Sequence, residues 1–453
     1  MTRLERSRER RLRSQDGQIF ILTVLILALG SGFLVFSLLG SRANAAEKNR
    51  ATDAAFLQVK QALMGWSAAR TPTVGSPTSR PGELPCPDMN NDGMDNDGAC
   101  AAGDIGRVPW KTLDIPEPKD GNGETLWYAI AGPFRYKPQA SSPITSDTLG
   151  TLTVYAGSSA TTQTSQAIAV LFAPGPPIGT QARGSAAAAC STTGTTIAQN
   201  LCAANYLEST GGGNNAQING PFIQAQSSST FNDRVLAITN ADLMPLVEQR
   251  VAREIMARLN QYKASEGSYP WADLANGDSN GDATSGFYNR PRFPCGTAKP
   301  TDWSALSPPI VLPDWLTNGC PDSGTGFVDG WSSVIYYAVA KNRLEAGGSN
   351  CTTCFGTTTL TVTNPNSLIA DVCSTISAVW ACRPTVLPAS TTADLVLITP
   401  GSATASRIAG WSNSSFSAIS GYFEDSENSD NNNDTYVVPS STRYDRDRLY
   451  IAQ

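Results

Sequence analysis

The chain has 453 residues, a formal net charge of −6 and ten cysteines, but it contains no histidine. The missing histidine excludes Ser-His-Asp and Cys-His catalysis as well as histidine metal sites, and the acidic balance argues against nucleic-acid binding. Hydrophobic residues make up 40% of the chain, which is enough for a core, and this length predicts two or three domains.

A basic leader, residues 1–17, is followed directly by an uncharged run, residues 18–41. At about 1.5 Å per residue, a helix over this run crosses a hydrocarbon core of roughly 30 Å. Arginine-rich flanks stay on the cytoplasmic side. We therefore expect a single-pass inner-membrane protein with a cytoplasmic N-terminus and a periplasmic or extracellular bulk. A plain anchor, and a secretory signal cleaved after Ala45, are the alternative interpretations.

An amphipathic helix is predicted next, over residues 47–69. Its apolar residues recur at helical spacing on one face; they are Phe56, Val59, Leu63 and Trp66.

A basic leader, a glycine at its end, and one helix that is apolar first and amphipathic later together resemble the type IV pilin and type II secretion pseudopilin family. The resemblance implies cleavage between Gly17 and Gln18, methylation of the new N-terminus, and packing with other pilin-like subunits in a filament. Family members usually carry glutamate five residues after the cut, where this chain has Leu22. A minor subunit at the filament tip also lacks that glutamate, so the departure favours a minor or tip role.

An internal repeat runs through the rest of the chain. The segment Asp120–Ala131 matches Asp329–Ala340, and Ala167–Gly175 matches Ala393–Gly401. Further landmarks follow in the same order: Arg183 with Arg407, Tyr206–Glu208 with Tyr422–Glu424, and Phe231–Thr239 with Asn432–Ser440. Each copy is preceded by an expected helix and a proline segment, Leu84-Pro85-Cys86 or Tyr269-Pro270-Trp271.

The second of these helices is predicted over residues 242–262, capped by Asn240 or Asp242. Its apolar stripe repeats every four residues: Leu243, Val247, Val251, Ile255 and Leu259. The expected fold class is therefore α+β, with a long N-terminal membrane helix followed by two tandem modules, 42–239 and 240–453. Each module would be a helix packed on a small antiparallel sheet, as in the pilin head.

The ten cysteines are expected to form disulfides, because their number is even and the chain is predicted to be exported. Proximity in sequence favours three local pairs: Cys86–Cys100, Cys190–Cys202 and Cys295–Cys320. The pairing of the remaining four stays open: Cys351, Cys354, Cys373 and Cys382.

An acidic loop at residues 88–97 is interpreted as a calcium site. Its first six residues fit D-x-[DN]-x-[DN]-G, which places oxygen ligands around one centre. The glutamate expected twelve residues after the start is replaced by Ala99, so a full EF-hand is excluded. The predicted ligands are Asp88, Asn90, Asp92, Asp95 and Asp97, with a second calcium site at Asp278, Asn280 and Asp282. Solvated turns are the alternative interpretation of both.

These features predict a minor pilin-like or pseudopilin-like subunit that initiates or caps an envelope filament, or presents a binding surface for a ligand at its tip. The expected partners are other pilin-like subunits and the inner membrane, with no nucleic acid and no enzymatic activity. The alternative is a membrane-anchored extracytoplasmic binding protein that never joins a filament. A carboxylate-type glycosidase is the third hypothesis, weakened because no acid–base constellation is visible.

Overall fold

The fold is described by a computed structural model, which places most of the chain after its first 43 residues. The described residues are 44–70, 80–95, 100–136, 143–157, 161–270, 309–310, 335–340, 359–376, 379–399, 435–438 and 447–453, together with Ser307, Trp331, Arg343, Gly401 and Asn428. The predicted leader (1–17) and apolar run (18–41) lie outside them.

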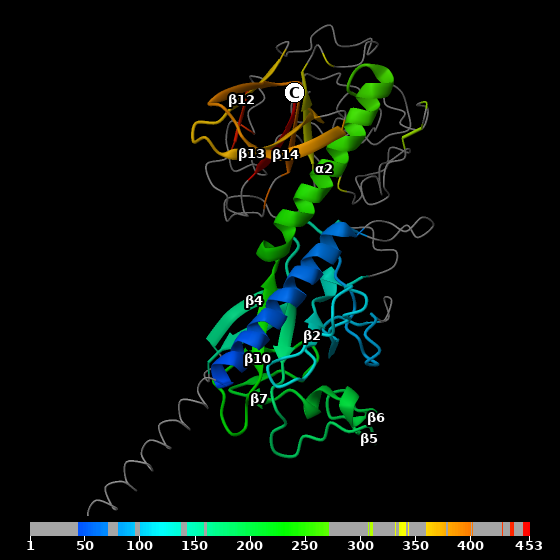
Figure 1. The fold of residues 1–453 in the computed structure, drawn as a ribbon, viewed down its shortest axis with the longest axis vertical. Helices are drawn as coiled ribbons and strands as arrows, with labels where there is room; N and C mark the ends of the chain where they lie inside the picture. The colour runs from blue at the N-terminus through cyan, green and yellow to red at the C-terminus, as the bar shows by residue number, and fades with distance from the viewer. Residues whose placement is uncertain are drawn as a thin grey trace, which may run out of the picture.

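The first half is one mostly antiparallel sheet crossed by a helix, the N-terminal helix, whose described part covers residues 44–69 (Figure 1). Phe56, Val59 and Leu63 are buried and Trp66 packs against the same core, so the predicted amphipathic stripe is confirmed. The first turns of the helix, residues 44–51, are exposed. The helix therefore packs on the sheet through its later turns, while its first turns add two surface hydrogen bonds, from Lys48 to Asn122 at 3.0 Å and from Arg234 to the Asn49 carbonyl at 3.1 Å.

Six strands form this sheet, in the order β1-β2-β4-β3-β9, with β10 also paired to β4. Their bounds are β1 (Ile105–Arg107), β2 (Trp127–Ile130), β3 (Leu152–Ala156), β4 (Thr161–Ala173), β9 (Phe222–Gln224) and β10 (Arg234–Thr239). The later part of β4, residues 167–173, is completely buried, as a central strand covered on both faces should be. Two small hairpins, β5 (Ala187–Ala189) with β6 (Thr196–Ala198) and β7 (Ser209–Thr210) with β8 (Gly213–Asn214), and three 3-10 turns, Gly132–Phe134, Gln199–Leu201 and Ala203–Asn205, complete this half.

Helix α2 (Asn240–Glu266) starts where β10 ends and runs from the first half into the second (Figure 1). All five residues of its predicted stripe are buried. Thr239, rather than Asn240, is the N-cap, and its backbone N–H donates to the Asp242 carboxylate at 2.9 Å. Because no loop separates β10 from α2, the helix direction is fixed by the first sheet.

The second half distributes its strands over two sheets. The first has the order β11-β16-β18-β13-β14, and the second has the order β15-β12-β17. The bounds are β11 (Tyr336–Val339), β12 (Leu360–Thr363), β13 (Ile369–Ile376), β14 (Val379–Val386), β15 (Ser390–Ala393), β16 (Leu395–Thr399), β17 (Thr435–Val437) and β18 (Arg448–Ala452).

Polar contacts join the two halves around the buried Glu248 of α2. Its carboxylate accepts hydrogen bonds from the Ser146 hydroxyl of the first half and from the Arg448 guanidinium of the second, the latter at 3.0 Å. Asn240 donates to the Ser146 carbonyl at 2.8 Å, and Lys60 of the N-terminal helix pairs with Asp242 at 2.7 Å. The junction is thus packed and hydrogen-bonded, with Glu248 at its centre.

Some landmarks of the repeat occupy matching positions. Strand β2 pairs antiparallel with β4, and β11 pairs in the same way with β16. Tyr128 of β2 donates its hydroxyl to the Pro85 carbonyl at 3.1 Å, and Tyr337 of β11 donates to the Pro270 carbonyl at 2.7 Å. The division of the chain at residues 239 and 240 itself remains a prediction.

One correspondence was assigned wrongly. β10, in the segment from Phe231, pairs with β4, and the strand that pairs with β16 in this way is β18. Thr435–Val437, in the segment that the sequence alignment chose, lies instead in the smaller sheet beside β12. The sequence comparison matched the Asn-Asp pair that both segments contain. The strands that correspond in the structure, β10 and β18, each begin instead at the arginine of an Asp-Arg pair.

The predicted fold class is wrong. The part of the chain that the structure describes has two helices longer than a turn, and its other regular elements are mostly strands. One six-stranded sheet in the first half stands against a five-stranded and a three-stranded sheet in the second. The extra strands come from Thr-rich alternating segments such as Leu360–Thr363. Threonine and β-branched residues favour strands, and the predicted plan of one helix and one small sheet per module did not include these segments.

The predicted single-pass inner-membrane localisation is also corrected. Within the described ranges, no helix combines the length and the apolar sequence that crossing a bilayer demands. The run on which that prediction depended, residues 18–41, is outside those ranges. Three disulfides indicate an oxidising compartment for the folded part.

Candidate functional site

Three disulfides brace the described regions. They join Cys86 to Cys100, Cys190 to Cys202 and Cys373 to Cys382. The prediction that the cysteines form disulfides is confirmed, and two of these pairs are among the three that spacing favoured. The third closes the β13–β14 hairpin, where the two cysteines face each other in register. The other four, Cys295, Cys320, Cys351 and Cys354, lie outside the described residues.

The acidic loop folds as a tight turn around the Asp88 carboxylate. One oxygen accepts backbone N–H groups of Asn90, Asn91 and Asp92 at 2.7 to 3.2 Å, and the other accepts that of Gly93 at 2.7 Å. Asp88 is only 2% exposed. Its charge is therefore met by oriented backbone dipoles, as in an Asx turn.

Three other predicted ligands in this loop, Asn90, Asp92 and Asp95, are more exposed. Asp92 accepts the Met94 N–H at 2.7 Å and the Asn90 amide at 2.9 Å. These two hydrogen bonds, with the nearby Lys111, hold the pKa of Asp92 below its usual value. Asp95 accepts the Thr112 hydroxyl at 3.2 Å.

Calcium binding at this loop remains a prediction. In the described part of the chain, no group of three or more acidic, cysteine or histidine side chains is placed to share one metal ion. Asp97 and the whole second set, Asp278, Asn280 and Asp282, fall outside the described residues.

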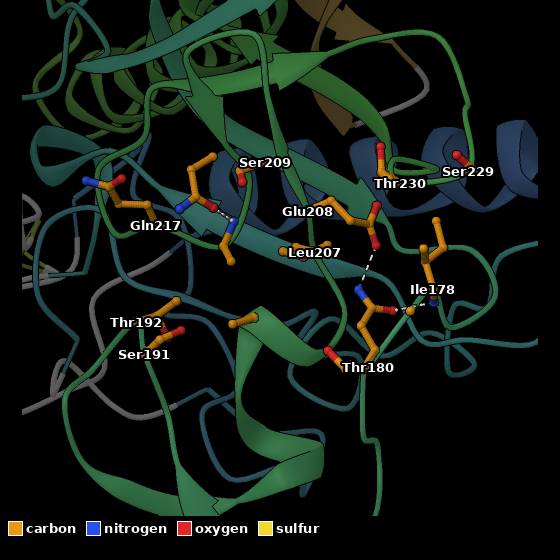
Figure 2. Close-up of a pocket in the computed structure, with 15 residues that line it drawn as sticks. Ile178, Thr180, Ser191, Thr192, Leu207, Glu208, Ser209, Gln217, Ser229 and Thr230 are labelled. Atoms are coloured by element: carbon orange, nitrogen blue, oxygen red, sulfur yellow. Dashed lines mark hydrogen bonds between the residues drawn. The ribbon is translucent and has the colours of Figure 1, made fainter.

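A polar cavity of about 740 Å³ lies in the first half, and no described residue of the acidic loop lines it (Figure 2). Such a volume is within the range of small-molecule sites. Hydroxyl and amide side chains dominate its wall; they are Thr180, Gln181, Ser191, Thr192, Ser209, Asn214, Gln217, Ser229 and Thr230. Ile178, Ala204, Leu207 and Ala216 add small apolar surfaces, and Glu208 is the one ionisable group among the described lining residues.

Hydrogen bonds fix the acidic edge of this cavity. The Gln181 amide donates to Glu208 at 2.7 Å, while the Gln181 oxygen accepts the Ile178 N–H at 3.0 Å (Figure 2). The second Glu208 oxygen accepts the backbone N–H groups of Asn232 and Asp233 at 2.9 and 3.2 Å. The orientation of Gln181 and Glu208 is therefore set before any ligand arrives.

Asp233 lies beneath the cavity and does not line it. It is 2% exposed, and it accepts the Glu208 N–H at 2.8 Å and the Asn215 amide at 2.9 Å. Its other oxygen has no partner among the described residues. Burial raises the pKa of Asp233 well above its usual range, and the neighbouring Glu208 charge raises it further. Because Asp233 is shielded from the cavity, the two carboxylates do not face a common substrate space.

Stacked cations and aromatic rings attach the cavity loops to the sheet. Tyr206 lies 5.1 Å from Trp127 of β2, centroid to centroid. Arg107 and Arg183 stand over the Tyr206 ring at 4.7 and 4.5 Å, and Arg183 also pairs with Glu124 at 2.8 Å. These contacts hold the segment that carries Glu208 rigidly.

The Asn–Asp pair under the cavity recurs in the second half. The Asn428 amide donates to Asp447 at 3.3 Å and to the Val437 carbonyl at 3.1 Å. Both aspartates are buried immediately before a strand, β10 or β18. The pair therefore has a structural role that is independent of the cavity.

The sequence had marked Glu208 only as part of a repeated Tyr-Leu-Glu landmark, and it gave Asn215 and the cavity no role. Comparisons with family models, with curated proteins and with solved structures gave no match. The assignment of function therefore depends on the residues and their geometry.

Proposed function

We propose that this protein is an exported, minor pilin-like or pseudopilin-like subunit of an envelope filament or secretion system. It would initiate or cap the filament, or present a binding surface there. The supporting observation is the N-terminal helix, which is fastened to the sheet by Phe56, Val59 and Leu63 while residues 44–51 stand exposed. In the sequence, the apolar run 18–41 leads directly into this helix.

Each part then has a physical role. The role proposed for the apolar run is to associate with the equivalent runs of neighbouring subunits. The exposed residues 44–51 would then connect the associated runs to the folded part. The disulfides stabilise the folded part outside the reducing cytoplasm. No catalytic activity is assigned.

The proposal is tested by the mass of the mature N-terminus. We expect the mature chain to begin at Gln18, methylated at its new amine. Gly17→Val should leave the chain uncut, while the neighbouring Asp16→Asn, the control, should be processed normally. A mature start at Ala46 or Glu47, or an intact Met1, would refute the proposal.

An extracytoplasmic binding protein that never joins a filament is the second candidate. The polar cavity favours it, because a formed site in a single chain needs no assembly. Co-purification of other pilin-like subunits with the processed chain would exclude this candidate, and an unprocessed chain isolated alone would support it.

A further inference from the structure

The cavity beside Glu208 is built by five separate segments of the first half, and no role in filament assembly requires it. Residues 178–181, the turn after Cys190, the 3-10 turn ending at Asn205, the β7–β8 hairpin and residues 229–230 contribute its walls. The Cys190–Cys202 disulfide ties two of these walls together. Preformed walls reduce the ordering cost of binding.

The lining chemistry limits the class of ligand. Among the described residues that form the wall, none is basic, and Glu208 carries the only charge. An anionic ligand would be repelled by Glu208. The nearby Arg183 does not line the wall, and it is engaged by Gln181 at 2.9 Å and by Glu124 at 2.8 Å. A largely apolar ligand would leave the hydroxyl and amide groups without partners, which costs free energy.

A neutral, hydroxyl-rich ligand satisfies the same wall. Serine and threonine hydroxyls both donate and accept, as do the amides of Asn214 and Gln217, whereas both ends of the Gln181 amide already have partners. Sugar hydroxyls have the same dual character, and their C–H faces can lie on Leu207 and Ala216. Glu208 offers a fixed acceptor at the edge of the site.

We propose that this cavity binds a neutral saccharide. The site belongs to one folded chain, so the inference is independent of processing at Gly17 and of any filament. It assigns Gln217 and Ser209 to the binding wall, where both appear in Figure 2.

Saturation-transfer NMR and calorimetry on the full chain test this inference with maltotriose, cellotriose and chitotriose as probes. We expect at least one of them to bind. Ser209→Trp fills the cavity and should abolish binding, and Gln217→Ala should weaken it about tenfold, the loss of one hydrogen-bonded contact of about 1.4 kcal/mol. Ser185→Trp, an exposed serine that does not line the cavity, is the matched control and should bind normally.

Three outcomes would overturn the inference. The first is that none of the three neutral saccharides binds. The second is that binding survives Ser209→Trp unchanged while circular dichroism shows the variant folded. The third is that a neutral Ser/Gly peptide binds while the saccharides do not, which would assign the cavity to extended protein segments.

Discussion

Asp233 is a buried acid in the core of the first half. Its carboxyl is buried beside Glu208, and one of its oxygens lacks a partner among the described residues. The folded state therefore binds a proton at Asp233 more tightly than the unfolded chain does. Both states are protonated below the unfolded value of about 3.8. The free energy of unfolding therefore falls as the pH rises from about 3.8 to the raised pKa of Asp233 in the folded state.

Asp233→Asn should remove this pH dependence. Its amide oxygen can still accept from Glu208 and Asn215, and its NH₂ can donate to the Glu208 carboxylate. We expect the variant to match the wild type in thermal unfolding near pH 4 and to become the more stable of the two as pH rises. Glu47→Gln, a change of an exposed acid, is the control. A variant that is destabilised equally at every pH would show that the neutral form is not favoured here.

At the scale of elements, the turn at residues 88–95 combines two roles that different side chains separate. Asp88 holds the turn through four backbone N–H groups, whereas Asp92 is exposed and points its charge outward from the fold. Cation binding at this turn would therefore depend on Asp92, whereas the stability of the turn depends on Asp88.

Removing each acid in the presence or absence of calcium tests this division. Asp88→Ala should destabilise the protein by about 2 kcal/mol even in chelator, since buried hydrogen bonds to a charge are lost. Asp92→Ala should leave the melting temperature in chelator almost unchanged. In the wild type, 1 mM calcium should add about 1.4 kcal/mol if the dissociation constant is about 0.1 mM, and Asp92→Ala should remove that gain. If calcium leaves the wild-type melting curve unchanged, the calcium prediction is wrong and the loop is only a hydrogen-bonded turn.

The sequence was most informative where the physics is local. Helical periodicity identified the buried stripes at Phe56 and Leu243, because the residues of one helix face recur every three or four positions along a short stretch of sequence. The N-cap was misplaced by one to three residues, at Asn240 or Asp242 rather than Thr239, as is common at helix ends. Disulfides across short loops were also accessible from spacing.

Long-range arrangement was less accessible. The parallel pairing of β18 with β13 joins residues far apart in sequence, and no local pattern encodes it. The cavity has the same origin, since Thr180, Ser209 and Thr230 come from segments that are separate in sequence. Glu208 could have been singled out as an acid that follows two apolar residues, but its partner Asp233 had no recognisable signal.

At the scale of the whole molecule, the junction between β10 and α2 decides how the halves are coupled. Thr239 pairs with Ala167 in the sheet and caps α2 at the same time. Insertion of Gly-Ser-Gly between Thr239 and Asn240 should separate these roles and displace Glu248 from Ser146. The same insertion after Gly194, in the turn of the β5–β6 hairpin, is the control.

Small-angle X-ray scattering measures the effect. We expect the junction insertion to broaden the distribution of distances between the halves, whereas the hairpin insertion should leave the profile of the wild type. Identical profiles for all three chains would mean that the contacts of Glu248 and Lys60 hold the halves together without the direct strand-to-helix connection.

The direct passage from β10 into α2 also determines how the molecule bears tension. A pull on the second half along α2 reaches β10 lengthwise, because no slack chain lies between them. β10 is paired with β4 over six residues, so the hydrogen bonds of that pair are loaded together in shear instead of opening one by one. A protein that is pulled from outside while its N-terminal helix is held would therefore resist through its central strands.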